Sequence, residues 1–205
     1  MIINVIDIIN SIVQCIMIIR TINYCLKDEY KKNNKELILY IIITCLGVIV
    51  SYKLVGNSSL NVLITHCISL MIPYLLFKKD ILGIIVGHTI IYCAIAFNSL
   101  IFSNIFFVVN NLINKPEYIQ SLQIMLIYLP QFIMAFIILQ NLNFVNKIYK
   151  VIRSKDLSVI SFLILSLILD FIGSFSIIIH GENNPIFLNI IFFLLSSFLV
   201  AITIY

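Results

Sequence analysis

The sequence predicts an all-α fold, a polytopic membrane bundle of about seven transmembrane helices. Of its 205 residues, 61% are hydrophobic and only 11% are charged, and the mean hydropathy is +1.11. Soluble globular chains contain roughly 45–50% apolar and roughly 25% charged residues. A soluble domain of this size leaves much of its surface in water, so it could not hide so many apolar side chains. Lipid must therefore surround most of the chain.

The apolar residues form long continuous runs, which predict helices rather than the strands of a barrel. In lipid every backbone N–H and C=O must be paired within the protein, which leaves only helices or closed barrels. Barrel strands need alternating polar and apolar residues, whereas a helix needs roughly 20 apolar residues to cross. We therefore interpret residues 1–205 as one transmembrane domain, with helices near residues 2–19, 37–55, 60–77, 81–107, 121–142, 157–179 and 186–205.

The first segment carries a polar stripe. Asp7, Asn10 and Gln14 follow one another at intervals of three and four residues, which places them on one face of a helix. Lipid would penalise such a face, so we expect it to point into the bundle.

The stretches between the apolar segments predict the connections. Residues 20–36 and 143–156 are rich in lysine and arginine, and both are predicted to be basic loops. Residues 110–120 form the longest polar connection on the other side of the membrane. Pro130 stands in the middle of the fifth segment, where it removes a backbone hydrogen bond and predicts a kink.

The distribution of basic residues predicts the orientation of the bundle. Of the thirteen lysines and arginines, eleven fall in the connections after the first, third and fifth segments, and only Lys53 and Lys115 fall on the other side. Because basic loops remain in the cytoplasm, we expect the N-terminus outside and the C-terminus inside. The abundance of isoleucine, asparagine and lysine indicates an AT-rich bacterial genome. The expected location is therefore the bacterial cell membrane, crossed several times.

Several charged or aromatic residues are candidates for ligand binding. Asp170 lies about midway along the sixth segment, where an unpaired charge is expensive, and Asp7 lies near the outer end of the first. Each carboxylate either contacts a ligand or ion, or makes a hydrogen bond between helices. The outer connections add side chains that could form the rim of a small-ligand pocket: Lys115, Glu117, Tyr118 and Glu182.

The chain offers no motif for catalysis. It has no Walker A, GxSxG or HExxH sequence, and its three histidines and five cysteines are scattered without a CxxC pair. We therefore expect no catalytic residue, cofactor, metal site or nucleic-acid partner. Gly83 and Gly87 form a GxxxG pattern, which lets helix backbones approach closely and allows a homodimer.

Four short stretches resemble one family of bacterial receptors. They are residues 59–65 (SLNVLIT), the basic turn at residues 74–79 (YLLFKK), residues 90–94 (IIYCA) and a second basic turn at residues 146–148 (NKI). With seven helices and an external N-terminus, the chain resembles the N-terminal sensor domain of AgrC-type quorum-sensing histidine kinases. The resemblance covers most of the chain through short motifs.

The resemblance implies a function in two-component signal transduction. The sensor domain would bind an extracellular cyclic autoinducing peptide, a pheromone, from the outer side of the membrane. The signal would then pass to a cytoplasmic histidine kinase region that this sequence does not contain. The chain itself would not be an enzyme, although the full receptor would be a kinase.

Two alternatives belong to other functional classes. A small membrane transporter or substrate-binding membrane subunit needs an internal polar path, which Asp170, Asn98 and the polar stripe could line. A membrane peptidase of the AgrB type needs a Gly-Gly-x-His element followed by a catalytic cysteine. This sequence contains no Gly-Gly, and His66 directly adjoins Cys67.

Overall fold

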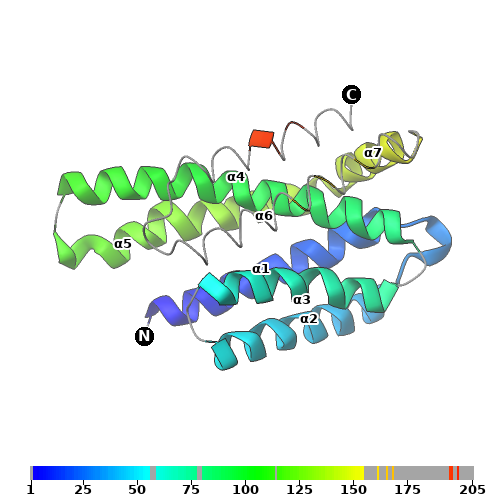
Figure 1. Ribbon diagram of the computed structural model, residues 1–205, viewed down its shortest axis with the longest axis horizontal. Helices are drawn as coiled ribbons and strands as arrows, with labels where there is room; N and C mark the ends of the chain where they lie inside the picture. The colour runs from blue at the N-terminus through cyan, green and yellow to red at the C-terminus, as the bar shows by residue number, and fades with distance from the viewer. Residues whose placement is uncertain are drawn as a thin grey trace.

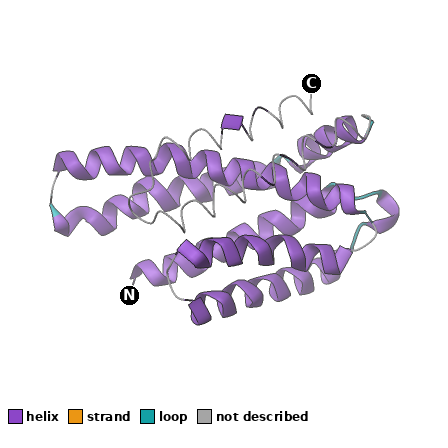
Figure 2. Ribbon diagram, viewed as in Figure 1, coloured by secondary structure: helices purple, strands orange, loops and turns teal. Residues whose placement is uncertain are grey.

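The fold is helical throughout the part of the chain that the structure describes. This computed structural model describes residues 2–55, 59–77, 80–113 and 115–154, together with six single positions at 161, 165, 168, 194, 195 and 198. No strand occurs among these residues, which confirms the predicted all-α class (Figure 2). Apart from those single positions, the predicted sixth and seventh segments, residues 157–179 and 186–205, lie outside the described residues.

Seven α-helices and three short helical turns follow one another along the described chain (Figure 1). They are α1 (Ile2–Tyr24), η1 (Asp28–Tyr30), α2 (Asn34–Val55), α3 (Ser59–Phe77), α4 (Ile81–Ile113), η2 (Pro116–Tyr118), α5 (Ile119–Gln123), η3 (Ile124–Tyr128), α6 (Leu129–Gln140) and α7 (Leu142–Arg153).

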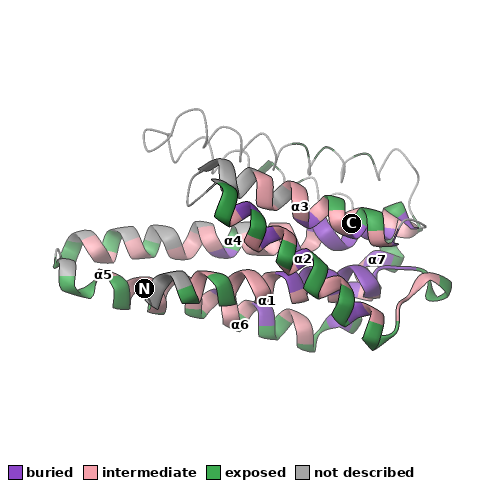
Figure 3. Cartoon of the chain, turned by 90° about the horizontal axis from the view of Figure 1, so that it is seen from below, coloured by how far each residue is buried: buried purple, intermediate pink, exposed green. Residues whose placement is uncertain are grey.

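Four stretches within these helices are long and apolar enough to cross a membrane. They are Val5–Tyr24, Asn34–Leu54, Ile81–Ser99 and Ile119–Gln140, and a shorter apolar helix covers Cys67–Phe77. The outward side of α2 exposes a row of large apolar residues, among them Leu39, Leu46 and Val50 (Figure 3). So large an apolar surface is unfavourable in water and is stabilised by lipid. Exposure and length therefore agree with contact between these helices and a bilayer.

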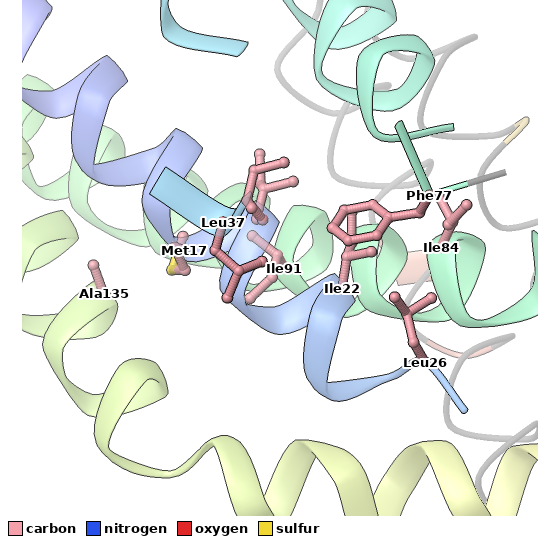
Figure 4. Packing of buried hydrophobic residues seen from close by; sticks show 10 residues of the cluster. Met17, Ile22, Leu26, Leu37, Phe77, Ile84, Ile91 and Ala135 are labelled. Atoms are coloured by element: carbon pink, nitrogen blue, oxygen red, sulfur yellow. The ribbon is translucent and has the colours of Figure 1, made fainter. Parts of the chain in front are cut away.

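Helix α1 is central in the described bundle. It contacts α2, α3, α4, α6 and α7, and α3 also packs against both α2 and α4 (Figure 1). The buried core forms around it from Met17, Ile19 and Ile22 of α1, from Leu26 just after its end, and from residues of the neighbouring helices (Figure 4). Those neighbours include Leu37, Phe77, Ile84, Ile91 and Ala135.

The bundle has two distinct ends. We call one the basic end: it consists of residues 25–33, Asp80 and residues 141–154, which lie together on the right of Figure 1. The opposite end holds the start of α1 and the connection between α4 and α5, on the left of Figure 1. This grouping brings together connections that are more than one hundred residues apart in the sequence.

Two predicted connections are shorter in the structure because the neighbouring helices continue. Helix α1 runs to Tyr24, since Thr21 and Asn23 are buried against the bundle and extend its packed face. Helix α4 runs to Ile113, so residues 114–118, not 110–120, connect it to α5. With 33 residues, α4 is about 50 Å long, which exceeds the roughly 30 Å of a bilayer core.

The prediction of a basic loop over residues 143–156 is wrong, because most of it is helix α7. Leu142, Val145, Tyr149 and Ile152 are buried at spacings of three, four and three residues. This helical period was hidden by the intervening lysines, which lower the average hydropathy of the stretch without disturbing its amphipathic pattern.

The region around Pro130 departs from α-helical geometry. The five residues before α6 form the π-helical turn η3, in which the Leu129 N–H donates to the Ile124 carbonyl. Proline lacks an N–H and its ring crowds the preceding turn, and a π-helical turn relieves that crowding by widening the helix. The sequence predicted a kink at Pro130, and the structure shows a π-helical turn just before it.

Two glycines let α4 approach the backbone of α1. A Cβ atom at residue 87 would lie 2.8 Å from the Ile22 Cα atom, and one at residue 83 would overlap the Cys25 carbonyl oxygen. Both residues are buried. The GxxxG pattern at Gly83 and Gly87 thus lies at a contact within the chain.

Replacing either glycine by alanine is expected to destabilise the bundle. Alanine favours helix formation, yet its methyl group would meet backbone atoms that cannot move aside, so we expect Gly83→Ala and Gly87→Ala to lower unfolding free energy by roughly 1–3 kcal/mol. Unfolding by SDS titration in mixed micelles measures the change. Gly47→Ala is the matched control, because its methyl would meet only the flexible side chains of Ile68 and Ile72. Equal stability of all three variants would contradict this account.

Candidate functional site

A hydrogen-bonded group of polar side chains joins α1, α4 and α6 inside the apolar bundle. Gln131 is at its centre: its Oε1 accepts from Asn10 Nδ2 at 2.6 Å and from Gln14 Nε2 at 3.5 Å. Its Nε2 donates to Ser99 Oγ at 3.4 Å. We call this group the polar seam, and its members are Asp7, Asn10, Gln14, Asn98, Ser99, Tyr128 and Gln131.

The π-helical turn and Pro130 contribute the rest of the polar seam. Tyr128, the last residue of η3, donates its hydroxyl to the Asp7 carboxylate. Asn98 Nδ2 donates to the Pro130 carbonyl oxygen at 3.3 Å. The polar stripe of α1 therefore faces the bundle, as its spacing predicted. One of its partners, Tyr128, comes from η3, the π-helical turn found among the described residues.

Three buried acceptors in and near the polar seam have no hydrogen-bond partner. They are Asn10 Oδ1, Asn98 Oδ1 and Gln123 Oε1. A buried polar atom without a partner costs roughly 1–3 kcal/mol, so most such atoms in proteins are paired. These oxygens are able to accept hydrogen bonds from N–H or O–H groups of a ligand or from water.

The residues predicted for ligand binding divide into three groups. Asp7 is part of the polar seam. Lys115, Glu117 and Tyr118 lie together in the connection between α4 and α5, all exposed, with Lys115 Nζ 5.9 Å from the centre of the Tyr118 ring. Asp170 and Glu182 lie outside the described residues.

Sequence reasoning missed Ser99, Tyr128 and Gln131 as partners of the polar stripe. Gln131 is an amide within an apolar run and directly follows a proline, which was a usable signal. The face of a helix near a π-helical turn cannot be assigned from a period of 3.6 residues, because the wider turn rotates the residues that follow.

The basic end contains a second polar centre around a buried carboxylate, Asp80. Its Oδ2 accepts from the Lys27 backbone N–H at 2.9 Å and from the Tyr149 hydroxyl at 3.0 Å. Arg153 Nη1 lies 3.3 Å from the same oxygen, and the Gly83 N–H donates to Oδ1 at 3.2 Å. We call these five residues the Asp80 clasp.

The Asp80 clasp connects three segments through one charge. Asp80 caps the start of α4, where a carboxylate is favourable beside free backbone N–H groups. It also holds the connection after α1 through Lys27 and the helix α7 through Tyr149 and Arg153. The sequence analysis did not predict this role for Asp80.

The electrostatic effect of the clasp extends to its neighbours. Burial, together with the Asp80 carboxylate, raises the pKa of the Cys25 thiol to about 12. Burial and the same carboxylate raise the pKa of the Tyr149 hydroxyl, and the Arg153 guanidinium lies 5.5 Å from the centre of the Tyr149 ring. Cys25 and Tyr149 are therefore neutral near pH 7, and Tyr149 acts as a hydrogen-bond donor.

The arrangement of histidine and cysteine bears on the peptidase alternative. His88 is fully enclosed, its Nε2 lies 3.2 Å from Ser69 Oγ, and its ring stacks on Tyr92. His88 and Cys93 are five residues apart on α4, so their side chains point about 140° apart. Within the described part of the chain, no three histidine, cysteine, aspartate or glutamate side chains gather as they would around a metal ion.

Comparisons of the chain with protein-family models, with curated proteins and with solved structures find no match.

Breaking the clasp is expected to loosen the basic end. Asp80→Ala removes a helix cap and an acceptor for two neighbouring segments, so we expect a loss of roughly 2–4 kcal/mol in unfolding free energy. The Cys25 thiol should also react faster with maleimide at pH 8, because its pKa falls and its cover opens. Mass spectrometry of the labelled protein measures this rate.

Asp28→Ala is the matched control for the clasp. Asp28 pairs with Lys31 at 2.6 Å, but its side chain is 95% exposed. Loss of so exposed a pair should leave both stability and Cys25 labelling unchanged. If Asp80→Ala behaved like Asp28→Ala, the clasp would have no role in holding the basic end together.

Proposed function

We propose that the chain is the transmembrane sensor part of a receptor for an extracellular cyclic peptide, of the AgrC type. The observation that carries the proposal is the polar seam: it is half-buried, it joins three helices, and some of its acceptor oxygens lack partners. A peptide ligand brings backbone N–H groups that such acceptors bind. The resemblance of four short stretches to that receptor family supports the same interpretation.

The proposed orientation puts the basic end in the cytoplasm. That end contains Lys27, Lys31, Lys32, Lys147, Lys150 and Arg153, whereas the connection between α4 and α5 contains one lysine, Lys115. Basic connections remain in the cytoplasm during insertion. The polar seam then lies toward the outer side, since Asp7 is near the start of α1 and Tyr128 is near the turn between α4 and α5.

The connection between α4 and α5 would form the outer rim of the ligand site. The connection exposes Tyr118, Lys115 and Glu117, and the last turn of α4 beside it exposes Leu112 and Ile113. A cyclic peptide with bulky apolar side chains would contact the apolar residues, and its polar backbone would reach the seam. Tyrosine is among the residue types that contribute most binding energy when a partner covers them, so Tyr118 is the expected anchor.

A path from the ligand site to the cytoplasm runs through α6 and α7. Gln131 and Ala135 tie α6 to α1, and only Asn141 separates the end of α6 from the start of α7. Helix α7 is in turn held by Asp80 through Tyr149 and Arg153. A ligand that binds one arrangement of α6 more tightly than another would thereby shift the position of α7.

The proposed orientation predicts which residues are accessible from outside the cell. In a cysteine-free background, a cysteine at position 115 should react with a membrane-impermeant maleimide in intact cells. A cysteine at position 147, also exposed on its helix, should react only after the membrane is opened. The reverse pattern would place the polar seam on the cytoplasmic side and would rule out a receptor for an external peptide in this form.

Peptide binding is the direct test of the proposed function. The chain in nanodiscs should bind a fluorescent cyclic peptide from the source strain saturably. Glu117→Gln and Asp7→Asn should each weaken this binding by about tenfold, because each removes a charge-assisted hydrogen bond to the peptide. Glu29→Gln, the same change at the basic end, should leave affinity unchanged. Fluorescence anisotropy measures all four proteins.

Two results would count against a receptor. The first is the absence of saturable binding for any cyclic peptide of the source strain. The second is peptide-independent uptake of a small solute into proteoliposomes that Asp7→Asn abolishes, which would favour the transporter alternative because the same polar seam could line a path.

A further inference from the structure

A cavity of about 300 Å³ opens at the basic end, between the last turn of α1, the connection that follows it and the first turn of α2. Its lining is strongly basic and polar: Arg20, Asn23, Tyr24, Lys31, Lys32, Asn34 and Leu37. Three of these seven residues are cations and none is acidic. The cavity is separate from the polar seam, which lies toward the opposite end of α1, and the Asp80 clasp contributes none of its lining residues.

Arg20 supplies the charge that the surrounding protein does not neutralise. Its Nη1 donates to the neutral Asn34 Oδ1 at 3.2 Å, and no ion pair to Arg20 is found among the described residues. A guanidinium has five N–H donors in a fixed plane, so several remain for an anion. The hydrogen bond to Asn34 is exposed, so the remaining donors of Arg20 are accessible to an anion that enters the cavity.

The ion pairs of Lys31 and Lys32 with nearby carboxylates are weak. Lys32 Nζ lies 3.5 Å from Glu36 Oε1, and Lys31 Nζ lies 2.6 Å from Asp28, whose side chain is 95% exposed. Exposed ion pairs contribute little free energy, so either ammonium can turn toward an anion in the cavity at small cost. The cavity therefore presents up to three positive charges to one guest.

The walls of the cavity are held in place by local hydrogen bonds. Asn23 binds both backbone groups of Lys32, accepting from its N–H at 2.8 Å and donating to its carbonyl at 3.4 Å. At the start of α2, Asn33 and Glu36 form a reciprocal capping box, at 3.0 and 3.3 Å. The connection thus keeps its shape without a ligand, which reduces the entropy lost on binding.

The position of the cavity indicates the kind of anion. The apolar stretch of α1 ends at Tyr24 and that of α2 begins at Asn34, so the cavity lies where both helices leave the apolar core. The first turns of α2 also expose Ile38 and Leu39. At this depth a bilayer presents phosphate groups, and basic pockets between helices at such a boundary bind anionic headgroups.

We propose that this cavity binds a phosphate group, supplied by the headgroup of an anionic phospholipid. The Arg20 guanidinium would bind two phosphate oxygens, since its planar fork matches them, while Lys31 and Lys32 would supply charge. The acyl chains would follow the exposed apolar side of α2. A free phosphate ion shares this chemistry, so the test separates the two sources. The proposal rests on neither the peptide ligand nor the orientation of the bundle.

Native mass spectrometry of the whole chain, released from micelles, tests the proposal. Phosphatidylglycerol should remain bound and phosphatidylcholine should not. Arg20→Gln should weaken phosphatidylglycerol binding by about tenfold, and Arg20→Lys by less, because it keeps the charge and loses the fork. Lys35→Gln is the matched control. It removes one positive charge from the first turn of α2, beside the cavity, but Lys35 itself does not line the cavity.

The remaining outcomes decide the source and the validity of the site. Inorganic phosphate alone, added to the micelles, should compete only weakly with the lipid if the headgroup is the natural ligand. Displacement of the lipid by micromolar phosphate would support the same site with a free phosphate as ligand. Should Arg20→Gln unfold the chain, Lys31→Gln combined with Lys32→Gln replaces it. Binding that is equal in the cavity variants and in Lys35→Gln would overturn the proposal.

Discussion

The close contact of α4 with α1 determines most of the described structure. Gly83 and Gly87 bring the α4 backbone against Cys25 and Ile22. Helix α1 also contacts α2, α3, α6 and α7, so it is the common neighbour of the longer helices. In lipid the helices gain little from hiding apolar surface, so close packing and hydrogen bonds hold them together. A helix pair that can approach closely therefore sets the position of the others.

Two polar centres lie at the two ends of this contact. The polar seam joins α1 to α4 and α6 through neutral amides and one carboxylate, whereas the Asp80 clasp joins α4, α7 and the connection after α1 through a single buried charge. Hydrogen bonds between helices in membranes contribute about 0.6–2 kcal/mol each. They add specificity to a core that consists largely of aliphatic side chains, which by themselves fix helix rotation poorly.

Helices α6 and α7 connect these centres, and this connection is the route by which the proposed receptor would pass a signal to the cytoplasm. Gln131 on α6 takes part in the polar seam, and Tyr149 and Arg153 on α7 take part in the clasp. The seam has acceptors without partners, while the clasp is well supplied with donors. Of these two centres, the polar seam is therefore the one at which a ligand can change the balance between two arrangements.

The sequence by itself determined the helical class, the inward direction of the polar stripe on α1 and the segregation of basic residues to alternate connections. These follow from composition and from a period of 3.6 residues, which act locally and leave a signal in any one segment. It also predicted the interruption at Pro130, since the missing N–H is a property of one residue.

Only the tertiary structure decided which groups meet: Asp7 with Tyr128, Gln131 with Ser99, and Asp80 with Lys27, Tyr149 and Arg153. Hydropathy assigned residues 143–156 to a loop, because averaging over lysines concealed the amphipathic period of α7, whose burial depends on contact with α1 and α4. These partners lie between 32 and 121 residues apart in the sequence, so their pairing leaves no trace in local pattern. Their meeting depends on how closely the backbones pack, and two glycines on α4 set that distance.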